Sequence, residues 1–336
     1  MCRLRLRRCA CRRRRHGKSG GRLRDRDELA ALCEAAVAPD DYVIDRLEDL
    51  ILLGVVQIAL DGERIVGMMH YSPSIDGSGW LRAARTHPDY QRRGVATALL
   101  GSFVGLGARS GVRALRLWSS AANVAGSASA NASGFREVAR FSRMKRKTMK
   151  GSNRGARISF TTELVQEILE SPILRHAGGY VPYDRAFIAL TPATIHLLAN
   201  SGALYRVAGG VVVLSPRPER EAETSQDFGL AAGDPAKVLG GIAAARVRGV
   251  ESVEVYLPFD RSVLDAAARA GFEPESWGQE AVLFERTLDV RPVSYRKRRT
   301  YAEIAAGKRE GYAALGLLAG KHDHASGGPY EDRWNR

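Results

Sequence analysis

Hydrophobic and polar residues follow one another along residues 25–148 in patterns that predict both helices and strands. Apolar residues that recur every three or four positions predict a helix that buries one face, whereas a period of two, or a short run of apolar residues, predicts a strand. The resulting order is two helices, a hairpin, and then a strand–helix–strand–helix–strand series. The predicted helices are 27–38, 42–53, 91–110 and 123–133, and the predicted strands are 55–60, 65–71, 80–86, 112–118 and 137–146.

A similar order of patterns returns later in the chain. Gly249–Tyr256 repeats the pattern of Gly111–Trp118 at an offset of 138, and Gly271-Phe272 repeats Gly134-Phe135 at an offset of 137. Two landmarks at nearly the same offset indicate that one fold occurs twice in tandem. The predicted helices of this second unit are 161–169, 191–199, 234–248 and 261–270, and its predicted strands are 203–207, 211–215, 249–256 and 282–288.

A turn that contains proline, arginine and glycine joins the predicted strand 80–86 to the helix after it. The start of a helix exposes backbone N–H groups and the positive end of the helix dipole, so it suits a phosphate group. Gly94 lets the backbone come close to such a group, and Arg92 and Arg93 add positive charge. The sequence therefore predicts a phosphate-binding loop over residues 91–96.

This strand, turn and helix resemble motif A of the GNAT superfamily of acetyltransferases, whose signature Gln/Arg-x-x-Gly-x-Gly/Ala reads Gln-Arg-Arg-Gly-Val-Ala here. Asn123 and the later Gly134-Phe135 resemble motif B of the same family. The resemblance implies an α/β (α+β) fold with two tandem GNAT-like domains, each a mixed, mostly antiparallel twisted sheet flanked by helices. It also implies that acetyl-CoA is the cosubstrate, that the loop binds its pyrophosphate, and that the preceding strand separates from its neighbour to admit the pantetheine arm. The residues that it assigns to acetyl-CoA are the backbone of Ala84, Arg85 and Thr86, the loop residues Gln91, Arg92, Arg93, Gly94, Val95 and Ala96, and Asn123.

The first copy departs from the family pattern in three respects. No good candidate for a strand precedes the first predicted helix. Many members carry a general-acid Tyr seven residues after the motif B Asn, and this chain has Ala130 there. The predicted helix 123–133 consists of small residues, and Gly126 within it costs about 1 kcal/mol relative to Ala, so we expect loose packing. Asn123 fits either a contact with pantetheine or a plain helix cap.

The second copy lacks the phosphate-binding loop. Asp234-Pro235 stands where the loop would be, and an acid at a helix start repels phosphate. We therefore expect this copy to be non-catalytic and to shape the acceptor pocket or stabilise the first copy. The expected organisation is a disordered basic tail at 1–24, a catalytic GNAT domain at 25–148, a linker at 149–158, a degenerate GNAT-like domain at 159–290, and a basic, largely disordered tail at 291–336.

The groups that activate the acceptor amine stay open at this point. His87 is a candidate base because its ordinary pKa lies near neutrality, although its motif position is usually structural. Arg85 either points into the acceptor pocket and binds a carboxylate there, or faces outward. Ordered water is a further choice of base, as are the carboxylates on the expected acceptor side, Glu48, Asp49 and Asp76.

Composition and charge indicate the class of protein and the character of the N-terminal arm. The chain is 45% hydrophobic and 26% charged and has no run of the ~18 apolar residues that a membrane helix needs, so we expect a cytoplasmic globular protein. Of the net charge of +14, residues 1–24 contribute +11, because they hold eleven Arg or Lys and no acid. Such an arm could bind RNA, or it could be a plain disordered extension. The four cysteines form neither a disulfide framework nor a metal site by their spacing.

These observations predict an acetyl-CoA-dependent N-acetyltransferase that acts on a primary amine of a small molecule or amino acid. A protein N-terminus or lysine as acceptor is an alternative within the same enzyme class. A non-catalytic protein that senses CoA, or that associates with RNA through its arm, is an alternative outside it. No metal and no membrane partner are expected, and the oligomeric state is left open.

Overall fold

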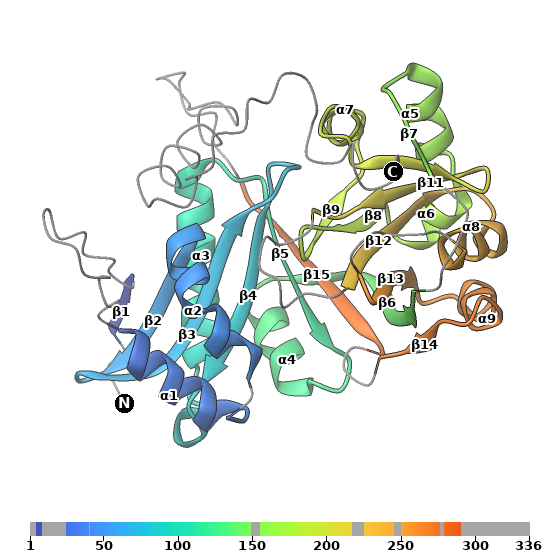
Figure 1. Ribbon diagram of the computed structural model, residues 1–336. Helices are drawn as coiled ribbons and strands as arrows, with labels where there is room; N and C mark the ends of the chain where they lie inside the picture. The colour runs from blue at the N-terminus through green and yellow to red at the C-terminus, as the bar shows by residue number, and fades with distance from the viewer. Residues whose placement is uncertain are drawn as a thin grey trace, which may run out of the picture.

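The computed structural model describes residues 5–8, 25–39, 41–148, 155–216, 225–244, 250–275 and 279–289. A sheet of 13 strands runs through this part of the chain, and helices cover both of its faces (Figure 1). The two halves of the chain form neighbouring parts of this sheet. The mixed, mostly antiparallel sheet flanked by helices that the sequence predicts is therefore confirmed.

The first copy has the predicted order of elements, with most boundaries within a few residues of those expected. Asp41 separates the first two helices, because its carboxylate caps the second by accepting from the N–H of Val43 at 3.2 Å. One start differs: the third helix begins at Val95, so residues 91–94 form a turn before it. The elements are α1 (Arg26–Ala36), α2 (Tyr42–Leu53), β2 (Val55–Asp61), β3 (Arg64–Pro73), β4 (Gly79–Thr86), the short 3₁₀ helix η1 (Pro88–Tyr90), α3 (Val95–Ser110), β5 (Ala114–Ser120), α4 (Val124–Ala132) and β6 (Arg136–Lys147).

Residues 5–8 correct the expectation of a disordered arm over residues 1–24. They form strand β1 (Arg5–Arg8), which pairs antiparallel with β2 at the edge of the sheet. The guanidinium of Arg7 donates to both carboxylate oxygens of Asp25, at 2.8 and 2.9 Å, and Asp25 is buried. This is the strand before the first helix that the family pattern requires. Residues 9–24 lie outside the described residues.

The second copy contains the predicted helices and hairpin together with elements that the sequence did not indicate. The unexpected ones are a helix of five residues, a small hairpin, and a strand before the helix that follows Asp234. The predicted linker 149–158 is corrected at its end, where residues 156–157 form an edge strand, and residues 149–154 lie outside the described part. The elements are β7 (Ala156–Arg157), α5 (Thr162–Leu169), α6 (Pro172–His176), β8 (Tyr180–Tyr183), β9 (Ala186–Ala189), α7 (Pro192–Asn200), β10 (Leu204–Val207), β11 (Gly210–Leu214), β12 (Ser225–Ala232), α8 (Pro235–Ala243), β13 (Ser252–Pro258), α9 (Arg261–Arg269), β14 (Glu273–Pro274) and β15 (Ala281–Thr287).

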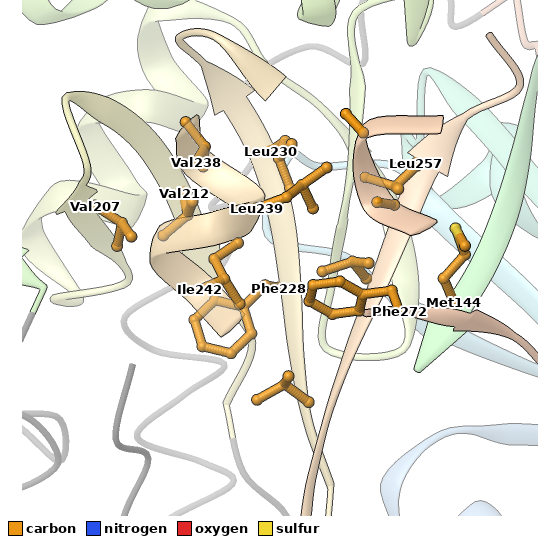
Figure 2. Packing of buried hydrophobic residues seen from close by; sticks show 14 of the residues in the cluster. Met144, Val207, Val212, Phe228, Leu230, Val238, Leu239, Ile242, Leu257 and Phe272 are labelled. Atoms are coloured by element: carbon orange, nitrogen blue, oxygen red, sulfur yellow. The ribbon is translucent and has the colours of Figure 1, made fainter. Parts of the chain in front are cut away.

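The two copies exchange strands. The predicted closing strand of the second copy, β15, lies between β5 and β6 of the first and is antiparallel to both (Figure 1). In return, β6 pairs with β13 and β14 of the second copy. As a result, Met144 of β6 packs in the hydrophobic core of the second copy with Phe228, Leu257 and Phe272 (Figure 2). A boundary at residue 148 therefore does not separate two independent sheets.

The helices and the small hairpin divide between the two faces of the sheet. α1 and α2 pack on one face of β2–β4, and α3 packs on the other. On β4, Leu81 belongs to the core under α3, whereas its neighbour Trp80 packs against Phe187 of the β8–β9 hairpin. Because neighbouring residues of a strand face opposite sides, the hairpin lies on the same face as α1 and α2. No helix in the described ranges is long and apolar enough to span a membrane.

Candidate functional site

β4 and β5 run side by side for only a short distance. They are parallel and pair at two positions, the last of which joins Trp80 to Arg116. Beyond Trp80, β4 continues to Thr86 and pairs with β3 alone. Ala84 lies in this segment and is exposed. The strand therefore separates from its neighbour as predicted, over the residues whose backbone the family resemblance assigns to the thioester.

The turn after β4 has an unusual backbone conformation. Arg92 and Gly94 have φ angles of +59° and +80°, and Gly94 is the N-cap of α3, where no side chain caps the helix. Left-handed residues in such a turn arrange backbone N–H groups into a concave, anion-binding array, and a non-glycine residue held there is typical of functional sites. A Cβ added to Gly94 would meet no heavy atom within 4 Å, so no other part of the described chain packs against this position of the turn.

Side chains around this turn fix its position. The Tyr90 hydroxyl donates to Asp61 at 2.8 Å and so ties the turn to the end of β2. The guanidinium of Arg93 lies over the Tyr90 ring, 5.3 Å from its centroid. Val95 is buried beneath α3 and rests against Gly67 of β3, where an added Cβ would lie 2.4 Å from Val95 Cγ1. Gln91, Arg92, Arg93 and Gly94 are exposed and Ala96 is half-buried, as a loop that binds a ligand requires.

Asn123 and Ala130 have structural positions in α4. Asn123 is exposed, and its carboxamide oxygen accepts from the N–H of Gly126 at 2.9 Å. The plain helix cap is thus present, and the contact with pantetheine stays a prediction. A Cβ on Gly126 would lie 2.5 Å from Asn123 Nδ2, so this glycine permits the cap to close. Ala130 is fully buried against the core under α3, which corrects the expected loose packing at that position.

Arg85 binds a carboxylate of the protein itself. Its Nε and Nη2 donate to the two oxygens of Asp41 at 2.5 and 2.6 Å, and its Nη1 donates to the carbonyl of Ala84 at 2.9 Å. Its guanidinium also lies over the ring of Tyr42. Of the two orientations considered for Arg85, these contacts disfavour the one in which its guanidinium binds a carboxylate of the acceptor. Arg85 joins β4 to the start of α2.

The other candidates for proton transfer are also engaged within the protein. The Nδ1 of His87 accepts from the N–H of Asp89 and caps η1, while its Nε2 contacts Arg64 at 2.8 Å. Glu48 forms an ion pair with Arg26 on the surface of the helix pair. The geometry therefore gives His87 the structural position that is usual for this motif.

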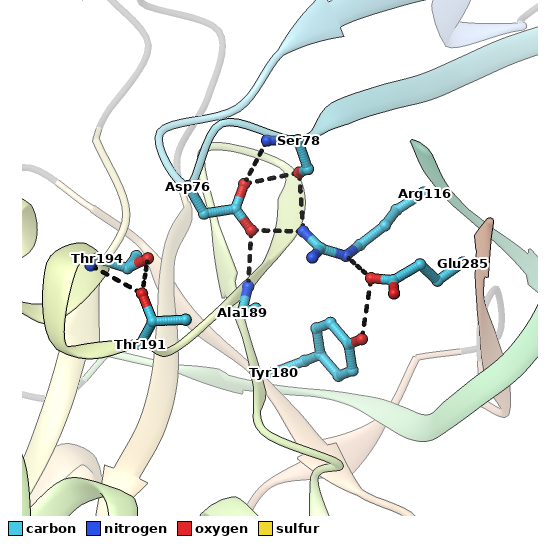
Figure 3. A network of polar contacts seen from close by, with 8 residues as sticks. All are labelled: Asp76, Ser78, Arg116, Tyr180, Ala189, Thr191, Thr194 and Glu285. Carbon is cyan, nitrogen blue, oxygen red and sulfur yellow. Dashed lines mark hydrogen bonds and ion pairs between the residues drawn. The ribbon is translucent and has the colours of Figure 1, made fainter. Parts of the chain in front are cut away.

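Asp49 is half-buried on α2. Asp76, another of those candidates, belongs to a buried network that joins the two copies (Figure 3). Its carboxylate binds the guanidinium of Arg116 at 2.5 Å and accepts from the backbone N–H of Ala189 on β9 at 2.9 Å. Arg116 also donates to Glu285 of β15 at 2.6 Å, and Glu285 accepts from the hydroxyl of Tyr180. Burial disfavours the charged carboxylate, but Arg116 and the hydrogen bonds outweigh it and lower the pKa of Asp76. Asp76 is thus a structural anion.

Two side chains that the sequence analysis passed over have unusual surroundings. Arg82 lies on β4 immediately beyond the point where β5 leaves it, and its Nε donates to His70 Nδ1 at 3.3 Å. Asp227 lies on β12, beside Glu254 of β13. Burial, and then the negative charge of Glu254, raise the pKa of Asp227 to about 6. Only a polar residue in an otherwise apolar strand pattern marks either position in the sequence.

We expect Asp227→Asn to stabilise the protein above pH 6. A carboxyl whose pKa is raised on folding contributes stability below its unfolded pKa, and this contribution is lost as the pH rises through the folded value. At pH 8 the gain should be about 2 kcal/mol, shrinking towards zero near pH 4. Urea unfolding at several pH values measures it.

Asp265→Asn, an exposed aspartate of α9, is the control and should change stability by no more than about 0.5 kcal/mol. An equal gain for Asp227→Asn at pH 4 and pH 8 would contradict the pKa argument.

Within the described residues of the second copy, the turn that precedes α8 is capped by a side chain. The carboxylate of Asp234 accepts from the N–H of Lys237 at 2.9 Å and so caps the start of α8. β12 and β13 pair over five positions, up to Gly229, where β4 and β5 pair over two. β8 covers β12 there, since a Cβ on Gly229 would lie 2.9 Å from Pro182. That the second copy is non-catalytic stays a prediction, and these contacts agree with it.

Comparisons with known proteins agree with this geometry. The sequence pattern of the acetyltransferase (GNAT) family matches residues 24–135. No curated protein sequence is significantly similar to the chain. Similar solved structures include a candidate acetyltransferase from Pyrococcus horikoshii, which is 14% identical with a TM-score of 0.50 and covers 85% of this chain and 90% of its own. A GCN5-related N-acetyltransferase from Sphaerobacter thermophilus is 14% identical with a TM-score of 0.48 and covers 78% of this chain and 92% of its own.

A tandem GNAT protein from the clavulanic acid biosynthesis pathway is 14% identical with a TM-score of 0.46, and covers 87% of this chain and 100% of its own. At such identities a structural likeness shows the fold alone, and the Pyrococcus structure shows it over most of the chain. Residues 24–135 therefore form an acetyltransferase domain of the GNAT family, and a second copy of the same fold follows it in the chain.

Proposed function

We propose that the protein is an N-acetyltransferase that moves the acetyl group of acetyl-CoA to the primary amine of a small molecule. The observation that carries this proposal is the open, uncapped start of α3 at Gly94, directly after the segment of β4 that has separated from β5. The turn 91–96 would hold the pyrophosphate, and the backbone of residues 84–86 would contact the thioester carbonyl. A phosphate at this helix start replaces water on N–H groups that nothing else satisfies.

Bound acetyl-CoA supplies an activated acyl group, and the residues of this chain hold it in place. In the reaction the amine nitrogen forms a bond to the acetyl carbon while the carbon–sulfur bond breaks, and the amine proton leaves to a base. Backbone N–H groups of β4 would stabilise the charge that develops on the carbonyl oxygen. His87 and Asp76 are engaged elsewhere, so ordered water at the acceptor side is our choice of base.

Calorimetric titration with acetyl-CoA, followed by a screen of acetyl-CoA consumption over amino acids, polyamines and peptides, tests this proposal. We expect saturable binding and turnover with a small amine. Turnover with peptides alone would identify a protein acetyltransferase instead. Binding without turnover of any amine would favour a CoA-binding protein without catalysis, and absence of binding would refute the assignment of the turn.

A further inference from the structure

Arg82 lies on β4 just beyond the point where β4 and β5 separate. It follows Trp80, the last residue of β4 that pairs with β5, by two positions and so shares its face of the sheet. That face carries α2 and the β8–β9 hairpin. If the proposed function is correct, the acetyl group lies close to the point where the two strands separate, and Arg82 stands beside it on the side of the second copy.

A buried histidine orients Arg82. His70 is the cross-strand partner of Arg82 on β3 and is fully buried. It fills the space above Gly54, where an added Cβ would lie 2.2 Å from His70 Nε2. Burial, and then the charge of Arg82, lower the pKa of His70 to about 3. The imidazole is therefore neutral, and its Nδ1 accepts the hydrogen bond from Arg82 Nε. This bond orients the guanidinium and does not engage its two Nη groups.

The guanidinium of Arg82 differs from those of three other buried or half-buried strand arginines. Arg85, Arg116 and Arg143 each bind a carboxylate, at 2.5, 2.5 and 2.6 Å. Within the described residues, Arg82 makes its one hydrogen bond to His70, and its two Nη groups donate to nothing. A guanidinium that is largely removed from water is costly unless a partner satisfies it. Burial lowers the pKa of Arg82, and the charge of the Asp184 carboxylate offsets part of that shift. A carboxylate from a ligand would bind the two Nη groups of Arg82 as Asp41 binds Arg85.

The tip of the β8–β9 hairpin brings one acidic and one basic side chain, Asp184 and Arg185, close to Arg82. Asp184 and Arg185 form a two-residue turn, with φ angles of +51° and +59°. Such turns favour Asn or Asp followed by Gly, so Asp184 is usual here, whereas Arg185 stands in place of Gly and is the strained position. Burial, and then the charges of Arg46 and Arg82, lower the pKa of Arg185 to about 10. The three guanidinium groups are therefore close enough to repel one another electrostatically. The carboxylates of Asp184 and Asp227 act in the opposite direction and raise the pKa of Arg185.

We propose that Arg82 binds a carboxylate of the acceptor through its two Nη groups, so that the acceptor is a small amine bearing an acid, such as an amino acid. The guanidinium presents two parallel N–H groups that match a carboxylate. Held in this way, the amine of such a molecule would lie on the side of β4 where the strands part. The inference rests on the proposed transferase function and assigns the second copy, through its hairpin, a part in acceptor recognition.

Matched acceptors test the inference. Each amino acid is compared with its C-terminal amide and with the decarboxylated amine, by kcat/KM in the acetyl-CoA assay and by calorimetric titration into protein saturated with CoA. We expect the acid to be preferred by about tenfold or more, the difference that one charge-assisted bidentate hydrogen bond produces. Arg82→Gln should remove the preference through the KM of the acceptor, and Arg82→Lys should keep part of it. The KM for acetyl-CoA should not change in either variant.

Arg109→Gln, on the exposed last turn of α3, is the control and should keep the full preference. Equal use or equal binding of acid and amide by the wild type would overturn the inference and leave the transferase intact, as would a preference that survives in a folded Arg82→Gln protein. If the wild-type protein does not bind acetyl-CoA at all, the proposed function itself is refuted.

Discussion

Gly94→Asp should abolish measurable binding of acetyl-CoA. The backbone at this position has a φ of +80°, and the space in front of it is open to a ligand. An aspartate there fills that space and adds a negative charge at the helix start, where two or more backbone hydrogen bonds to phosphate are expected. Each such bond to a charged group is worth about 1.5–3 kcal/mol, so we expect the dissociation constant to rise by about 100-fold or more. Isothermal calorimetry and the acetyl-CoA assay both measure this.

The control for this substitution is Gly62→Asp. Gly62 has a φ of +60° in the turn between β2 and β3, and no heavy atom lies within 4 Å of an added Cβ. The backbone strain of about 1 kcal/mol and the added charge are therefore matched, while the phosphate loop is untouched. Thermal unfolding should shift alike in the two variants. Comparable CoA binding in both would show that the start of α3 does not hold the diphosphate.

The elements of the first copy could be predicted because their signals are local. The apolar period of a buried helix face, or the glycine and proline of a turn, can be recognised within a window of about a dozen residues. The loop at 91–96 is of this kind, since strand, turn and helix adjoin in the sequence. Strand β1 is the exception: its arginines read as a charged tail, and nothing local shows that Arg7 has a buried partner in Asp25.

What the sequence could not reveal is long-range pairing. The pattern of β15 is the same whether it completes its own copy or lies between β5 and β6, so the strand exchange has no local signature. β12 was missed because its face beneath the β8–β9 hairpin carries Asp227 and Gly229 where apolar residues were sought.

The arginine that we propose for acceptor binding was passed over for a similar reason. By simple alternation Arg82 and Arg85 would face opposite sides of β4. The register shift opposite Met68 and His70, with a φ of +55° at Ala83, turns both towards α2. This irregularity therefore determines that Arg85 binds Asp41 while Arg82 faces His70.

Arg116→Met should destabilise the protein strongly. Arg116 is 6% exposed, and it holds Asp76, at 3%, and Glu285, at 18%, in one network across the two copies (Figure 3). Removing the guanidinium leaves two carboxylates buried without their cation, which costs about 3–5 kcal/mol. Urea unfolding at pH 7 should show an earlier midpoint. Because the pKa of Asp76 is lowered from 3.8 on folding, its contribution is complete above that value and is lost at lower pH. The variant should therefore lose less stability on acidification than the wild type.

The matched control is Arg140→Met. Arg140 also binds two glutamates, Glu137 and Glu280, but it is 45% exposed, and exposed ion pairs contribute about 1 kcal/mol or less. Adding Asp76→Asn and Glu285→Gln to Arg116→Met removes the uncompensated charges and should restore part of the lost stability. If Arg116→Met and Arg140→Met shift the midpoint equally, burial does not determine the strength of these networks. The association of the copies would then depend on the exchanged strands, on the apolar contacts of Trp80, Phe141 and Phe187, and on other polar pairs such as Arg143 with Glu254, rather than on the Arg116 network.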